Sequence, residues 1–361
     1  MTDTPLSPGP LSPGATIGIL GGGQLGRMLA MAAARLGFRT QIYEPGDAPA
    51  AQVANGWTRA AWTDEQALAA FAGSVDVVTY EWENVPAETL DLLEASRPIR
   101  PGRAALRVAQ DRLDEKRFLE GLGLTVAPFR DVPDLGALTA ALAELGRPAI
   151  LKTRRLGYDG KGQVRIDDAT GAAEAFAAIE GADAILEGVV TFDREISVIV
   201  ARGVTGETVC FDPGENVHAE GILRTTTVPA ALTASQRQDA VLLAGRIVSA
   251  LDYVGVMGVE LFATGTGLVV NEIAPRVHNS GHWTEAACAV DQFEQHIRAI
   301  AGLPLGDGRR HADAVMENLI GDDMDRLPEL LAAPDTRLHL YGKAETRPGR
   351  KMGHATRLTR R

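Results

Sequence analysis

Short apolar runs and amphipathic stretches alternate along the first third of the chain. The runs 16–20 (TIGIL), 39–44 (RTQIYE) and 75–80 (VDVVTY) are mostly apolar and of strand length, which predicts buried β-strands. The Ala-rich stretch 27–37 between the first two runs predicts a helix. A strand, a helix and a second strand in this order predict a β-α-β unit, so we expect a parallel sheet with packed helices.

The pattern becomes more varied after residue 109. Residues 110–121 are amphipathic and predict a helix, and apolar strands are predicted at 149–152, 184–188 and 194–203. A further helix is predicted over 284–300. At 361 residues the chain is long for one core, so we expect two or three domains of mixed α/β and α+β type.

Two strand-like runs near residue 266 predict a hairpin that carries an acid on each arm. Glu260 lies on the first run and Glu272 on the second, with glycines in the turn between them. If the turn centres near Thr266, the two carboxylates face each other on one side of the sheet, about 5 Å apart at Cβ. Such a pair suits magnesium, and the alternative is two solvated glutamates.

A dense polar run follows this hairpin. It is too short for a long helix and too polar for a core, and it contains the predicted catalytic residues Arg276, His278, Asn279 and Ser280. Together with the acids just before it, this run is the strongest candidate for a reaction centre.

The glycine turn after the first predicted strand, GGGQLG at 21–26, is a candidate anion site because it opens a helix N-terminus. It also fits the G-x-G-x-x-G pattern of dinucleotide-binding proteins, with Glu44 as the acid about twenty residues on. A phosphate of a substrate and a simple tight turn are the other readings. Glu81 and Glu83 follow the strand 75–80, at the edge where parallel sheets bind ligands.

The loop 153–163 (TRRLGYDGKGQ) predicts a flap that closes over phosphates, with Lys152 as a fixed charge before it. A solvated hairpin is the alternative. Arg112 and Lys116 share a face of the helix 110–121, where a solvated face is the default expectation. Near the end, Lys343 and Arg350 stand on Gly/Pro turns and predict a phosphate clamp or a solvated basic loop.

Composition narrows the class of partner. The chain has 36 Lys and Arg against 47 Asp and Glu, a net charge of −11, which argues against nucleic acid and anionic membranes. Two cysteines without C-x-x-C spacing fit a reducing cytosol, so we expect a cytoplasmic protein. Residues 1–14 are rich in Pro, Gly and Ser and lack a signal-peptide core, which predicts a disordered leader, and no apolar run is long enough for a membrane span.

Six motifs, in this order, resemble the 5-(carboxyamino)imidazole ribonucleotide synthase family of the ATP-grasp superfamily, over nearly the whole chain. They are GGGQLGRML (21–29), TYEWENV (79–85), LKTRRLGYDGKGQ (151–163), EISVIVARG (195–203), NEIAPRVHNSGHWT (271–284) and RPGRKMGH (347–354). The third and fifth motifs are specific, whereas GGGQLG alone is not.

The resemblance implies an ATP-grasp architecture with a Rossmann-like pre-ATP-grasp domain, a small lid and a mixed α/β carboxyl domain. We place the first domain at 15–109, the lid with its connecting helix at 110–190, and the carboxyl domain with the metal and substrate site at 191–361. The implied reaction joins bicarbonate to 5-aminoimidazole ribonucleotide through carboxyphosphate, with ATP as the energy source and Mg²⁺ or Mn²⁺ as the metal. A homodimer is also implied.

The resemblance assigns roles residue by residue. The implied nucleotide contacts are Arg112, Lys152, Gly157, Tyr158, Asp159, Gly160, Lys161, Gly162, Gln163, Glu187, Gly188, Val189, Val190, Glu195, His218, Asn271 and Glu272. The implied ribonucleotide contacts are Gly23, Gln24, Leu25, Glu81 or Glu83, Tyr158, Asp159, Lys161, Lys343 and Arg350. Lys152, Tyr158, Asp159 and Lys161 join the predicted catalytic group, and Glu260 and Glu272 are the implied metal ligands.

Two departures and three rival functions remain. Many relatives carry arginine where Lys161 stands, and many ATP-grasp enzymes carry asparagine where Ala274 stands, so the number of bound metals stays open. The rivals are another ATP-grasp ligase that acts on an acyl phosphate, a nicotinamide-dependent oxidoreductase based on G-x-G-x-x-G, and an inactive ATP-binding regulator.

Overall fold

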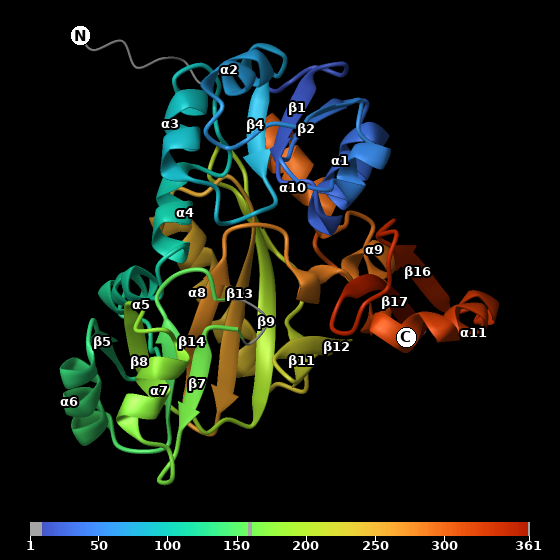
Figure 1. The fold of residues 1–361 in the computed structure, drawn as a ribbon. Helices are drawn as coiled ribbons and strands as arrows, with labels where there is room; N and C mark the ends of the chain where they lie inside the picture. The colour runs from blue at the N-terminus through green and yellow to red at the C-terminus, as the bar shows by residue number, and fades with distance from the viewer. Residues whose placement is uncertain (1–8, 158–160, 360–361) are drawn as a thin grey trace.

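The computed structural model describes residues 9–157 and 161–359 and contains three β-sheets (Figure 1). The first sheet is parallel, with strand order β3-β2-β1-β4, and its helices lie at the top of the view. Its elements are β1 (Thr16–Leu20), α1 (Gln24–Arg35), β2 (Arg39–Tyr43), the 3-10 helix η1 (Pro49–Gln52), β3 (Gly56–Thr58), α2 (Glu65–Gly73), β4 (Val77–Tyr80) and α3 (Ala87–Glu94). The predicted β-α-β unit is therefore present, because its strands are buried apolar runs joined by an amphipathic helix.

Two short helices, α4 (Arg103–Ala109) and α5 (Arg112–Gly121), lead from the first sheet to a second, antiparallel one. The second sheet has the order β5-β8-β6-β7, and we refer to it with its two helices as the lid. Its elements are β5 (Phe129–Val132), α6 (Leu135–Leu145), β6 (Ala149–Thr153), β7 (Gln163–Ile166), α7 (Ala172–Ala178) and β8 (Ala184–Gly188). Apolar side chains from both helices and the strands form a separate small core, so the lid is a unit of its own.

The third sheet has nine strands and forms the centre of the molecule (Figure 1). Its order is β14-β13-β9-β11-β12-β15-β17-β16, with β10 paired to β9, and all its neighbours are antiparallel. The strands are β9 (Arg194–Arg202), β10 (Thr208–Cys210), β11 (Gly214–Ala219), β12 (Ile222–Val228), β13 (Gly255–Thr264), β14 (Gly267–Ala274), β15 (Asp313–Ile320), β16 (Thr336–Leu340) and β17 (Lys351–Thr359). The helices are α8 (Ala234–Ala250), η2 (Asn279–Gly281), α9 (Thr284–Ala287), α10 (Gln292–Ala301), η3 (Gly321–Arg326) and α11 (Leu327–Ala332).

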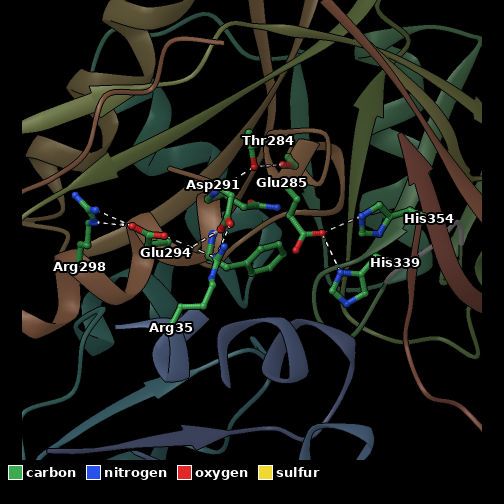
Figure 2. A network of polar contacts seen from close by, with 11 residues as sticks. Arg35, Thr284, Glu285, Asp291, Glu294, Arg298, His339 and His354 are labelled. Atoms are coloured by element: carbon green, nitrogen blue, oxygen red, sulfur yellow. Dashed lines mark hydrogen bonds and ion pairs between the residues drawn. The ribbon is translucent and has the colours of Figure 1, made fainter. Parts of the chain in front are cut away.

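The first sheet and the third sheet share one hydrophobic core, in which α1 packs against α10. An ion pair reinforces this contact, since Arg35 at the end of α1 lies 2.6 Å from Asp291 (Figure 2). Asp291 also caps α10, because its carboxylate accepts hydrogen bonds from the backbone N–H groups of Phe293 and Glu294. The first and third sheets are therefore joined by apolar packing and by the ion pair between Arg35 on α1 and Asp291 at the start of α10.

Two predictions are corrected by the structure. The predicted helix 284–300 is two helices, because Cys288 is extended and Asp291 starts a new helix as its cap. The predicted disordered leader does not hold for residues 9–14, where Leu11 N donates to Ala301 O and Gly14 N donates to Gly37 O. Residues 1–8 of that leader lie outside the described part of the chain.

Among the described residues, no helix is both long enough and apolar enough to cross a membrane.

Candidate active site

Two glutamates face each other across neighbouring strands of the third sheet. Glu260 on β13 pairs directly with Glu272 on β14, so the opposition predicted from the hairpin pattern is confirmed. The hairpin turns between Thr264 and Gly267, and the φ of Gly267 is +145°, a value that glycine adopts readily. The register shifts next to the glutamates, which leaves Asn271 as an extra residue in β14. Such a bulge re-aims side chains, and here it lies directly beside the two acids.

The two glutamates have different electrostatic surroundings. Burial and the facing Glu272 carboxylate raise the pKa of Glu260 to about 8. Burial also opposes the charge on Glu272, but the Arg112 and Lys152 cations outweigh it and lower the pKa of Glu272 to about 2. Two carboxylates this close repel each other when both are ionised, unless a cation lies between them. The oxygen donors and the unrelieved repulsion therefore fit a hard divalent ion such as magnesium.

The polar segment after β14 folds back toward Glu260. His278 Nε2 lies 3.2 Å from Glu260 Oε1, and His278 Nδ1 lies 2.8 Å from the Ser280 hydroxyl oxygen. Burial and the Arg276 cation lower the pKa of His278 to about 3, so its imidazole is neutral at pH 7. The Asn279 amide is buried, and neither its nitrogen nor its oxygen has a hydrogen-bond partner among the described residues. Buried polar groups of this kind are usually satisfied, so Asn279 is available to a ligand.

The flap predicted over 153–163 reaches the acid pair through Arg112. Arg112 Nη1 lies 3.0 Å from Glu272 Oε2, and Nη2 donates to the Gly157 carbonyl over 3.2 Å. At the other end of the flap, the φ of Gly162 is +70°, and a side chain there would collide with Thr153. Lys161 and Gln163 are exposed, whereas the predicted contacts Tyr158, Asp159 and Gly160 lie outside the described residues.

The predicted adenine and ribose contacts gather where β8 and β9 meet the acid pair. Lys152 Nζ on β6 lies 2.7 Å from Glu187 Oε2 on β8, and the Lys152 and Lys116 cations outweigh burial to lower the pKa of Glu187. Glu195 on β9 bonds His218, and this contact outweighs burial to raise the pKa of His218. Gly188 ends β8, and Val189 and Val190 follow it at the surface. One cavity is lined by Glu195, Ile196, Asn216, Glu260, Leu261, Phe262 and Asn271.

The glycine turn after β1 opens α1 with Gly23 at its N-cap. The Gly23 N–H donates to Glu81 Oε1 over 2.7 Å, and the Gly22 N–H donates to Glu44 Oε2 over 3.1 Å. Two carboxylates of the protein thus already interact with this helix terminus, where a substrate phosphate was one predicted partner. The Leu25 side chain is 8 % exposed and packs in the core, so the substrate contact predicted for this turn would involve the Leu25 backbone.

The boundary between the first and third sheets collects the remaining predicted substrate residues. Arg276 Nη2 lies 2.8 Å from Glu83 Oε2, which links the catalytic run to the end of β4. Lys343 and Arg350 lie between β16 and β17 and donate to backbone carbonyls of that stretch over 2.7 and 2.9 Å. The same stretch contacts η1, because the Gly342 carbonyl accepts a hydrogen bond from Gln52. These groups therefore line one boundary, and Arg276 connects it to the Glu260–Glu272 pair, whose carboxylates act on Arg276 electrostatically.

A cluster of one acid and two histidines, which we call the Glu285 cluster, lies beside the Lys343–Arg350 stretch. Glu285 Oε2 lies 3.0 Å from His339 Nδ1 and 3.2 Å from His354 Nε2, so one carboxylate oxygen contacts both rings (Figure 2). His354 Nδ1 is also 2.9 Å from the Tyr341 hydroxyl. Burial opposes the charge on Glu285, but the two histidines outweigh it and hold the pKa of that carboxyl well below its usual range. The cluster ties α9 to β16 and β17.

Two buried charged residues were missed by the sequence reading. Lys116 is 1 % exposed and Glu115 is 2 % exposed, so the expectation of a solvated face on α5 is wrong. Lys116 Nζ donates to the Asn271 carbonyl over 2.7 Å, and Glu115 Oε1 accepts from the Ile273 N–H over 2.7 Å. Burial and the Glu272 carboxylate raise the pKa of Glu115 to about 8. The spacing of charges on the helix gave no signal that β14 would cover them.

Comparison with known proteins gives matches along the whole chain. Three family models match: the ribonucleotide synthetase preATP-grasp domain at 14–110, the ATP-grasp domain at 117–293, and the phosphoribosylaminoimidazole carboxylase C-terminal domain at 314–361. The N5-carboxyaminoimidazole ribonucleotide synthase of Brucella melitensis is 58 % identical over 352 residues, which cover 96 % of this chain and 97 % of that protein.

Two solved structures show the same fold with ligands. A crystal structure of an N5-carboxyaminoimidazole ribonucleotide synthetase in its ADP complex has a TM-score of 0.94 at 43 % identity, covering 97 % of this chain and 94 % of the other. The N5-carboxyaminoimidazole synthase of Aspergillus clavatus, in complex with ADP and 5-aminoimidazole ribonucleotide, has a TM-score of 0.90 at 31 % identity, covering 96 % and 94 %.

Proposed function

We infer the chemistry of this site from the premise that the chain belongs to the N5-carboxyaminoimidazole ribonucleotide synthase family of the ATP-grasp superfamily. The chain is an ATP-dependent ligase that converts 5-aminoimidazole ribonucleotide to its N5-carboxylated product in purine biosynthesis. The oxidoreductase and the inactive regulator find no support in these relatives. Bicarbonate is the carbon source that we propose.

One observation carries the assignment of the reaction centre: Glu260 and Glu272 oppose each other under a flap that Arg112 connects to them. We propose that these two carboxylates hold Mg²⁺, with Mn²⁺ as a substitute, beside Asn271. When bound, the ion would neutralise charge on the β- and γ-phosphates of ATP, as in other phosphoryl-transfer sites. Burial and the facing Glu272 carboxylate raise the pKa of Glu260, and this supports the proposal because a bound cation would favour the ionised form of both acids.

Nucleotide binding is proposed along the lid side of the site. Glu187 to Val190 would meet the adenine, and Glu195 with its partner His218 would meet the ribose. Lys152 and Arg112 would contact the phosphates together with the flap residues 157–163. Lys152 now pairs with Glu187, so the phosphates would compete with that carboxylate for the ammonium.

The first chemical step makes carboxyphosphate. An oxygen of bicarbonate attacks the γ-phosphorus of ATP, the bond to the β-phosphate oxygen breaks, and ADP leaves. We propose that the unpaired Asn279 amide and the Arg276 guanidinium orient the bicarbonate. We propose that His278, which is neutral and lies 2.8 Å from the Ser280 hydroxyl oxygen, orients the reacting groups through hydrogen bonds rather than through a charge. A closed flap would exclude water, which would otherwise hydrolyse the acyl phosphate.

The second step transfers the carboxyl group to the amine of the ribonucleotide. The amine nitrogen bonds to the carboxyl carbon, phosphate leaves, and the nitrogen loses a proton; carbon dioxide released within the site is an alternative route. We propose that Lys343 and Arg350 bind the ribonucleotide phosphate and that Glu81 or Glu83 faces the ring. Gly23, Gln24, Tyr158, Asp159 and Lys161 are proposed as further contacts.

Three further proposals concern the location of the protein, its oligomeric state and its domain bounds. We propose a cytoplasmic homodimer, and we propose the domain division 15–109, 110–190 and 191–361. The separate core of the lid supports the middle part of that division.

The experiment that tests the function measures ADP release with ATP and Mg²⁺, with and without 5-aminoimidazole ribonucleotide and bicarbonate. Labelled bicarbonate should appear in the N-carboxylated product, and ADP release should require the ribonucleotide. Labelled product formed instead with formate or an amino acid would identify another ATP-grasp ligase. Buffer carbon dioxide must be removed for the control without bicarbonate.

A further inference from the structure

Helix α5 presents three charged side chains to one short segment of β14. Residues 112, 115 and 116 are three and four positions apart, so they share one helix face. Arg112 binds the Glu272 carboxylate, Glu115 binds the N–H of Ile273, and Lys116 binds the carbonyl of Asn271. One helix face therefore contacts three consecutive residues of β14, and the central one is the proposed metal ligand.

The contacts from α5 fall on the open edge of the sheet. β14 ends the strand order and pairs along its length only with β13, apart from an isolated bridge between Val270 and Val126 on its other side. On its other side the Val270 N–H donates to the Thr125 carbonyl over 2.8 Å, and Lys116 and Glu115 bind the next two outward-facing groups. An edge strand without such partners is free to shift or fray. The bulge at Asn271 weakens the ladder at the same point, so the position of Glu272 depends on these outer contacts.

Lys116 also joins this segment to the lid. Its ammonium lies 2.7 Å from the Asn271 carbonyl on β14 and 3.5 Å from Glu187 Oε1 on β8. The ammonium is almost completely buried, with its side chain 2 % exposed, so water cannot replace either partner. One positive charge thus fixes the distance between the strand of the metal ligand and the strand of the proposed adenine contacts.

The polar contacts of Glu115 and Lys116 are specific to two backbone groups of β14. Burying Lys116 with its partner Glu187 costs solvation energy, and well-packed apolar residues of the same volume are often as stable or more stable. Apolar side chains at 115 and 116, however, would leave the Ile273 N–H and the Asn271 carbonyl without these partners. Glu115 and Lys116 therefore set the positions of these two backbone groups.

We propose that Glu115 and Lys116 are positioning residues that hold Glu272 and Asn271 in register for the metal–nucleotide complex. This inference rests on the proposed metal role of Glu272. Neither residue contacts the reacting atoms; both act through β14. Partners that orient metal ligands from outside typically change metal affinity by about 10–100-fold when they are removed.

The test measures Mn²⁺ affinity of the enzyme–ADP complex by electron paramagnetic resonance, which needs neither bicarbonate nor ribonucleotide. Glu115→Met and Lys116→Met are expected to weaken that affinity by about 10–100-fold. Glu115→Gln keeps an oxygen acceptor for the Ile273 N–H and should stay close to the unaltered protein. Arg117→Met is the matched control, because Arg117 is exposed on the same helix.

Unaltered Mn²⁺ affinity in Glu115→Met or in Lys116→Met overturns the assignment of that residue, even if its melting temperature falls. If Lys116→Met does not fold, Lys116→Gln is measured instead, because it retains an N–H donor but no charge. Its Mn²⁺ affinity should be lower than that of the unaltered protein, by less than the loss expected for Lys116→Met. Ribonucleotide-dependent ADP release by the unaltered protein tests the proposed function separately. If the unaltered protein shows no ribonucleotide-dependent ADP release but the variants bind Mn²⁺ more weakly, the proposed reaction is refuted and the positioning role of Glu115 and Lys116 is supported.

Discussion

The Glu260–Glu272 pair and the Glu285 cluster both place acidic side chains beside strands of the third sheet, but their carboxylates have opposite kinds of neighbour. Glu260 faces another acid and has a pKa raised to about 8 by burial and by that neighbour. Glu285 faces two histidines and has a pKa held low by them, against the effect of burial. The first pair sets two acids against each other, whereas the acid of the second cluster has two histidine partners of its own.

This difference separates a reaction centre from a support. Two like charges placed close together destabilise a protein. Such pairs are therefore found mainly at functional sites, where a bound ligand offsets the repulsion. A closed network of one acid, two histidines and a tyrosine leaves no such demand, and it joins α9 to the two strands that lead into the Lys343–Arg350 stretch. We therefore expect changes at the first cluster to remove chemistry and changes at the second to remove stability.

The largest expected effect is at the first cluster. Glu272→Ala should reduce both ATP cleavage and carboxylation by at least about 10²–10³-fold, because a charge that acts on the phosphates is lost. The measurement is initial-rate ADP release and labelled-product formation with saturating Mg²⁺. Full activity under those conditions would remove Glu272 from the metal site and erase the contrast between the clusters.

The second effect concerns the stretch that the Glu285 cluster supports. Lys343→Ala and Arg350→Ala should each raise the KM for the ribonucleotide by about 10–100-fold, because a hydrogen bond to a charged phosphate is lost. The KM for ATP should stay close to its original value. An unchanged ribonucleotide KM in both variants would reject the phosphate clamp.

The third effect is on stability. Glu285→Ala should lower the free energy of unfolding by about 1–3 kcal/mol, since two buried ring N–H groups lose their acceptor. The kcat should change by less than about threefold, because the Glu260–Glu272 pair is a separate site. Denaturant unfolding and steady-state rates provide both numbers. Glu329→Ala, an exposed acid on α11, is the control. A large loss of kcat without a loss of stability would make Glu285 part of the reaction centre.

The smallest effect is in the pH dependence. Because the folded pKa of Glu285 lies below the unfolded value of about 4.3, its contribution is present above that pH and is lost as pH falls further. Below about pH 4.3 the unaltered protein should lose up to about 1.4 kcal/mol per pH unit more than Glu285→Gln. Unfolding curves at pH 5 and pH 3.5 measure this. Parallel losses in both proteins would show that Glu285 is not held ionised by its histidines.

The sequence was sufficient for the hairpin and its two acids, because a hairpin is a local structure. The turn at Gly265 and Thr266 would by itself place Glu260 opposite Asn271, and the bulge at Asn271, which the pattern did not predict, brings Glu272 into that position. The β-α-β unit was predictable for the same reason, since its strands and helix have clear periods. The domain bounds and the roles of the site residues remain predictions.

Contacts between residues far apart in the chain could not be predicted from the sequence. Lys116 is buried by a strand 155 residues further along the chain, and helical spacing alone gives no sign of that partner. Glu81 was expected to face a ligand, but it binds the Gly23 N–H, 58 residues away. The break in the predicted helix 284–300 follows from Asp291, whose double role as a cap and as the partner of Arg35 requires the folded structure.

The bond between Arg35 and Asp291 has a consequence for the order of substrate addition. It fastens α1 to α10, so the glycine turn, Glu83 and Arg276 are assembled on one body before any nucleotide arrives. The surfaces proposed to receive the ribonucleotide therefore lie on one body without ATP. We expect the ribonucleotide to bind whether or not ATP is already present.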